Sequence, residues 1–194
     1  MKTSLTFLLL LTAVLVTGGP AAAQSNDSAA VATCQKKIDY IEKNGAMAKP
    51  DPKPTQFTEQ EVNAYLASGK VKLPQGVQSL HLQGQPDVIT GTARVDFDQV
   101  KSGRQSGNPL LSMFSGVHDL AVVAHARGVN HKGYVQVDSA SLDGVEIPHF
   151  ALELFIEKFV QPKYPGVGMN SQFDLPAKID SASVGQHEVT VLQK

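Results

Sequence analysis

The chain has 194 residues, of which 42% are hydrophobic and 18% are charged, and its formal net charge is -1. Because that charge is close to zero and the basic residues are scattered, the composition argues against a nucleic-acid partner. The single cysteine excludes a disulfide within the chain, so the fold must be held by packing.

The first 23 residues are predicted to form a cleavable secretory signal peptide. Lys2 supplies a positive start, and residues 5–16 form an apolar run that is too short to span a bilayer. The small residues that end at Ala23 match the pattern that signal peptidase cleaves. Removing 23 of the 194 residues leaves 171, enough for one domain with a substantial core. We therefore expect a periplasmic or secreted protein that is cleaved near Ala23.

The mature chain is predicted to begin with a separate helix in segment 24–46. Apolar residues recur there at three- and four-residue spacing, at Val31, Cys34, Ile38 and Ile41. This spacing predicts a helix over residues 26–44 and places Cys34 on its buried face. Residues 47–55 contain three prolines and are expected to form an extended linker, which leaves the helix loosely attached.

Residues 56–194 are predicted to form a single α+β domain that opens with a capped helix. Thr58 and Glu61 have the spacing of a capping box, in which each side chain bonds the other's backbone amide. Phe57 can pack on Val62 as a hydrophobic staple across the same helix start. We therefore expect a helix to begin at this point.

The next part of the chain changes to a period of two, which is typical of strands with one apolar and one solvated face. The clearest strand covers residues 87–100, and weaker alternation covers residues 77–83, 120–127 and 134–142. The short connections between these segments contain glycine and asparagine and predict an antiparallel meander.

A second helix is predicted over residues 149–160, directly after Pro148. Its apolar side chains cover more than one face, whereas an ordinary surface helix buries a single stripe. This surplus indicates a helix that is buried on several sides or lines an apolar cavity. Two further strands, near residues 178–184 and 187–192, are expected to close the domain as a hairpin.

Two short motifs carry a resemblance to a known class of proteins. The sequence FTEQEVNAYL at residues 57–66, and DGVEIP at residues 143–148 running into the apolar helix, resemble TULIP-like bacterial envelope proteins of the LmeA and YpmS types. The resemblance covers about residues 55–194, and the helix at residues 26–44 has no counterpart in it. It implies lipid binding by a strongly curved antiparallel sheet that wraps around a helix and leaves an apolar groove for acyl chains.

The expected fold is therefore α+β, with a curved antiparallel sheet, made of the meander and the C-terminal hairpin, wrapped on two amphipathic helices. A cystatin-like domain with a helix on a sheet is the alternative, because it also pairs an early helix with a meander. The two differ in whether the sheet curls enough to leave a cavity, and periodicity does not report curvature.

The sequence shows no catalytic motif. The six histidines lack the spacing of an HExxH helix or of another zinc site, although His125 and His131 flank a turn where a metal site is conceivable. Ser115 is not part of a GxSxG elbow, and residues 166–168 lack the third glycine of a nucleotide loop. We expect no enzyme activity, no cofactor and no metal.

The expected function is non-enzymatic binding of a lipid or another apolar ligand in the cell envelope, with transient membrane contact. A scaffold that binds another envelope protein through the same apolar surface is the main alternative, and a hydrolase with an unrecognised site is a third. The candidate ligand-binding residues lie on the second helix and its expected neighbours: Leu154, Phe155, Phe159, Phe150, Tyr65, Leu66 and Phe97.

Overall fold

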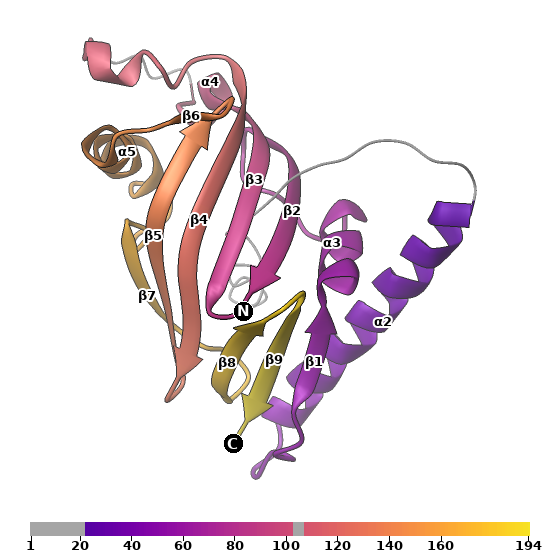
Figure 1. Cartoon of the computed structure of the whole chain (residues 1–194). Helices are drawn as coiled ribbons and strands as arrows, with labels where there is room; N and C mark the ends of the chain where they lie inside the picture. The colour runs from indigo at the N-terminus through magenta and orange to yellow at the C-terminus, as the bar shows by residue number, and fades with distance from the viewer. Residues whose placement is uncertain (1–21, 103–106) are drawn as a thin grey trace.

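The computed structural model describes residues 22–102 and 107–194. The described part has an α+β fold, in which an open antiparallel sheet of nine strands carries helices at both of its ends (Figure 1). The predicted signal peptide rests on the sequence, because residues 1–21 lie outside the described part.

The first helix, α2 (Ala22–Gly45), covers the predicted residues 26–44. The helix was expected to be loosely attached, but it is packed into the fold, because its residues Cys34, Ile38 and Ile41 are all buried. Buried amides also tie its end to the last strand. Asn44 Nδ2 donates to Gln193 Oε1 at 2.8 Å, and Gln193 Nε2 donates to the carbonyl of Ile41 at 2.8 Å. The predicted linker therefore connects two parts that share one core.

The capped helix is confirmed as α3 (Glu59–Ala67), which follows a short strand, β1 (Thr55–Thr58). The Glu61 amide donates to Thr58 Oγ1 at 3.2 Å, and the Thr58 amide donates to Glu61 Oε2 at 2.9 Å. Phe57 and Val62 are both buried in one apolar cluster, as expected for a staple.

The predicted meander is also confirmed. It consists of β2 (Val77–Gln85), β3 (Val88–Asp96), β4 (Val117–Val129) and β5 (Lys132–Leu142). The predicted strand over residues 87–100 ends early, at Asp96. Its carboxylate accepts from the amides of Asp98 and Gln99 at 3.1 Å and so starts a short helix, α4 (Phe97–Val100).

The last third of the chain contains the predicted helix and hairpin and two short strands that were not expected. A 3-10 turn, η1 (Pro109–Leu111), precedes β4, and β6 (Val145–Glu146) pairs with β5. The predicted helix is α5 (His149–Phe155), continued by a π-helical turn, η2 (Ile156–Val160). Like β6, the strand β7 (Asn170–Asp174) was not expected, and it pairs with β5. The predicted hairpin is β8 (Ile179–Gly185) with β9 (Glu188–Gln193).

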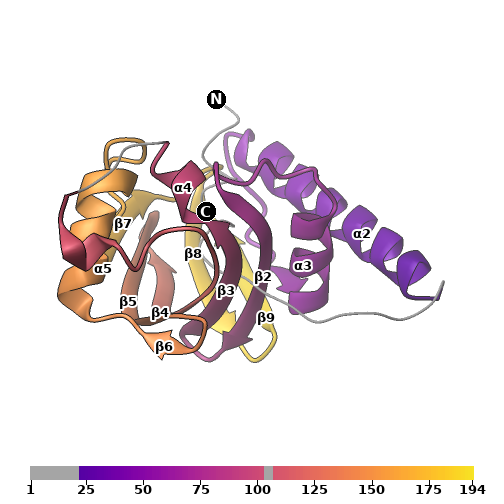
Figure 2. The same ribbon diagram turned by 90° about the horizontal axis from the view of Figure 1, so that it is seen from above.

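A junction near Gly128 joins the meander to the smaller β8–β9–β1 unit. β4 pairs with β3 as far as His125, and beyond it Arg127 and Gly128 pair with β8. A Cβ atom at Gly128 would lie 2.7 Å from the backbone nitrogen of Ala182, so only glycine allows this close approach. Seen from above, the strands lie between α5 on one side and α3 and α2 on the other (Figure 2).

Candidate functional site: an apolar sheet face with two cavities

One face of the meander is apolar along its whole length. On β4 this face carries Leu120, Val122, Ala124, Ala126 and Gly128, which alternate with residues of the opposite face. Across the register, Val122 lies opposite Gly91 of β3 and Ala140 of β5, and Gly128 lies opposite Gly133. Small residues in the middle of the face leave unfilled volume between the sheet and the elements that cover it.

The larger volume lies beneath α5, and we call it the α5 cavity. It measures about 290 Å³. Its floor comes from the apolar faces of β2 to β5, and its wall from α5 and η2. The wall residues are Leu152, Phe155, Ile156, Phe159 and Val160.

Aromatic packing holds the wall of the α5 cavity in place. The Phe155 ring stacks on Phe114, with centroids 4.3 Å apart, and meets Phe97 edge to face at 5.5 Å. Phe159 lies 5.3 Å from Phe155. All four rings are less than 5% exposed. The wall is therefore a close-packed layer that meets the cavity on one side and the core on the other.

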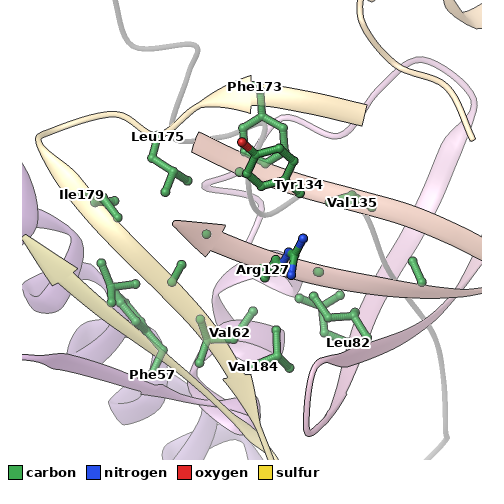
Figure 3. Close-up of a pocket in the computed structure, with 18 of the residues that line it drawn as sticks. Phe57, Val62, Leu82, Arg127, Tyr134, Val135, Phe173, Leu175, Ile179 and Val184 are labelled. Atoms are coloured by element: carbon green, nitrogen blue, oxygen red, sulfur yellow. The ribbon is translucent and has the colours of Figure 1, made fainter. Parts of the chain in front are cut away.

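A second cavity, the α2 cavity, lies at the other end of the same sheet face and measures about 140 Å³. It is lined by α2, by β1 and α3, and by the β8–β9 hairpin, and Figure 3 shows Phe57, Val62, Leu175, Ile179 and Val184 around it. Val167 lines both cavities. The two volumes therefore adjoin along one apolar face.

Few charges border these cavities. Among the described residues that line them, Lys163 is the single charged residue of the α5 cavity and Arg127 that of the α2 cavity. The Arg127 guanidinium lies 5.8 Å from the centre of the Tyr134 ring, within the range of a cation–π contact. No carboxylate lines either cavity within the described part of the chain.

The structure brings three of the predicted site residues together. Phe97, Phe155 and Phe159 line the α5 cavity. Leu154 packs on the same cluster without lining the cavity, and Phe150 is 59% exposed and points away from the core.

The other two predicted residues, Tyr65 and Leu66, lie elsewhere. Both are buried in the cluster beneath α3 and line neither cavity, and the Tyr65 hydroxyl donates to Gln35 Oε1 at 2.9 Å. Sequence reasoning missed the α2 cavity and the small floor residues such as Gly91 and Ala124. The signal that could have found them is the run of Gly and Ala on the apolar side of otherwise regular strands.

The two histidines that flank the β4–β5 turn, His125 and His131, have separate partners and do not form one site. His125 Nδ1 lies 2.7 Å from Asp138 Oδ2, whereas His131 Nδ1 contacts the carbonyl of Ile179 at 3.0 Å. Within residues 22–102 and 107–194, no three His, Cys, Asp or Glu side chains are placed to hold a metal ion.

Cys34 has no partner thiol and is 1% exposed, as the helical pattern predicted. Burial raises the pKa of its thiol to about 12, with the Glu61 carboxylate adding to the shift. A thiol in this state is a packing residue and a poor nucleophile.

Comparison of the chain with protein-family models, with curated proteins and with solved structures finds no match. Among the described helices, none has both the length and the apolar content that a membrane span requires.

Proposed function

We propose that this chain is an exported, non-enzymatic binding protein for a lipid or a similarly apolar molecule, whose hydrocarbon part lies in the α5 cavity. The sheet, in this proposal, works as a TULIP-like groove, with acyl chains between the apolar strand face and the wall formed by α5 and η2. The α2 cavity gives a long or branched chain a second place on the same face.

The α5 cavity carries this proposal. The cavity is partly open to solvent and measures about 290 Å³, whereas a closely packed protein interior leaves few gaps larger than a water molecule. Ligand pockets have volumes of about 300 Å³ and more, and they are lined mainly by apolar and aromatic side chains. Apolar cavities exclude water and accept apolar ligands, so a lining of Phe, Val, Leu and Ile favours hydrocarbon.

Titration with an uncharged fluorescent probe, N-phenyl-1-naphthylamine, tests the proposal. We expect saturable binding by the wild-type protein and its marked weakening in Val160→Asp, because burying a carboxylate against bound hydrocarbon costs free energy. Val160 lines the cavity, whereas Val129 is 42% exposed and lines neither cavity. Val129→Asp is therefore the matched control and should bind like the wild type.

Exposed apolar side chains favour a second candidate function, an envelope scaffold that binds another protein. Val145 and Phe150 are 68% and 59% exposed, on β6 and at the start of α5. Large exposed apolar residues in one region are typical of interaction surfaces. If the wild-type protein binds no apolar probe, the scaffold becomes the better account.

A further inference from the structure

Lys163 is placed where the head group of an amphiphile bound in the α5 cavity would lie. It follows η2 by three residues, lines the cavity and is exposed to solvent. Ile156, Phe159 and Val160 of the preceding turn line the same cavity with apolar side chains. Apolar side chains therefore line this part of the cavity next to a lysine that is also exposed to solvent.

Lys163 forms no ion pair with a carboxylate among the described residues. Its Nζ donates to the carbonyl of Val100 and to Ser102 Oγ, both at 2.7 Å, and both acceptors are neutral. The ion pairs of the described residues do not include Lys163, and residues 1–21 and 103–106 contain no Asp or Glu in the sequence.

Other lysines show the contrast. Lys101 is paired with Asp98 at 3.0 Å and Lys37 with Glu61 at 2.6 Å, and neither lysine lines a cavity. A lysine whose ammonium is already bonded to a carboxylate attracts an external anion weakly. Lys163 forms no ion pair among the described residues and lines an apolar cavity. The anionic group of a bound ligand would supply the missing partner of its ammonium.

We infer that the ligand is an anionic amphiphile whose acidic head group binds the Lys163 ammonium while its hydrocarbon occupies the α5 cavity. This inference rests on the proposed function and adds the chemical class of the ligand. A carboxylate and a phosphate share the needed chemistry, since each accepts a charge-assisted hydrogen bond from an ammonium. A fatty acid and a phospholipid are both sources of such a group.

Displacement of N-phenyl-1-naphthylamine by three single-chain competitors tests the inference. Oleic acid supplies a carboxylate, oleoyl lysophosphatidic acid supplies a phosphate, and oleyl alcohol supplies the same chain without charge. We expect at least one anionic competitor to bind roughly three- to tenfold more tightly than the alcohol, the range of a partly exposed charge-assisted contact. The preference should shrink between about 0.01 M and 1 M salt.

Variants of Lys163 locate the preference. Lys163→Met should abolish the difference in affinity between the anionic competitors and oleyl alcohol, and Lys163→Arg should keep that difference. Lys158 is the control, because it lies exposed on η2 but does not line the cavity. Lys158→Met should keep the preference, so that a general effect of positive charge is separated from local contact.

The outcomes distinguish the inference from the proposed function. If both anions bind more tightly than the alcohol, the inference holds for a carboxylate and for a phosphate head group. If only one anion does, its head group is the one that Lys163 selects. Equal binding of the alcohol and both anions by the wild-type protein, or an equal loss in the Lys158 and Lys163 variants, overturns the inference and leaves lipid binding standing. If the probe itself does not bind, the proposed function falls and this inference falls with it.

Discussion

Filling the α5 cavity from its floor is the sharpest perturbation that the structure offers. Val122 lines the cavity from the middle of β4, between Gly91 on one neighbouring strand and Ala140 on the other. A phenylalanine at this position adds four carbon atoms, and small cross-strand neighbours give its ring room. Val122→Phe should therefore occupy part of the volume of about 290 Å³ that the ligand would use.

The sign of the stability change decides whether that volume is empty in the free protein. If it is, the four added carbons bury apolar area at about 0.8 kcal/mol per methylene-sized group, so the free energy of unfolding should stay level or rise by up to about 3 kcal/mol. If the region were close-packed, the same substitution would overpack it and cost about 1 to 3 kcal/mol. Urea unfolding of the ligand-free variant measures the difference.

Probe titration completes the test. Val122→Phe should weaken binding of N-phenyl-1-naphthylamine by at least about tenfold, because ring and probe compete for one space. Val123 is the next residue and faces the opposite side of the sheet, so Val123→Phe should bind like the wild type. A loss of several kcal/mol in Val122→Phe, or full probe binding by a stable variant, would show that the ligand does not occupy empty space beside Val122.

Three further predictions concern parts of the fold outside the cavity. Thr58→Ala should lower the free energy of unfolding by about 1 kcal/mol, because it removes the bond that caps α3, and a urea midpoint equal to that of the wild type would contradict this. The Cys34 thiol, with a pKa raised by burial to about 12, should react with a maleimide only in denaturant, and rapid labelling of the folded protein would show that α2 detaches. The hydrogen bond from His118 to Asp143 raises the pKa of His118 above 6.5 and lowers that of Asp143 below 3.8. Its stabilisation should therefore be fullest between about pH 4 and 6.5, decline as the pH rises through the folded pKa of His118 or falls through that of Asp143, and vanish in Asp143→Asn, which NMR titration of His118 can check.

Local sequence signals predicted the elements of this fold well wherever one short segment determines the structure. The capping box at Thr58 and Glu61 and the alternation along β3 fixed a helix start and a strand because both patterns act within a few residues. β7 escaped prediction because its five residues alternate weakly and pair only with the outer edge of β5. The attachment of α2 escaped because Asn44 and Gln193, which join its end to β9, are 149 residues apart.

The residues of the candidate site were likewise predictable only where the signal lies within one segment. The apolar surplus of residues 149–160 pointed to Phe155 and Phe159, which line the α5 cavity, because amphipathic imbalance is visible within one helix. Phe150 belongs to the same surplus and is exposed, since helix periodicity alone does not say which apolar side meets the sheet. The floor of the cavity depends on register, which sets Gly91 beside Val122, and register between strands is a property of the folded sheet.

The proposed function, a hydrocarbon held in the α5 cavity of the folded protein, can be tested by native mass spectrometry of the purified full chain. We expect a non-covalent mass increment of lipid size on the folded protein, which organic extraction removes and which Val122→Phe reduces. A wild-type protein that carries no such increment, and that takes up none after incubation with oleic acid or lysophosphatidic acid, would contradict it.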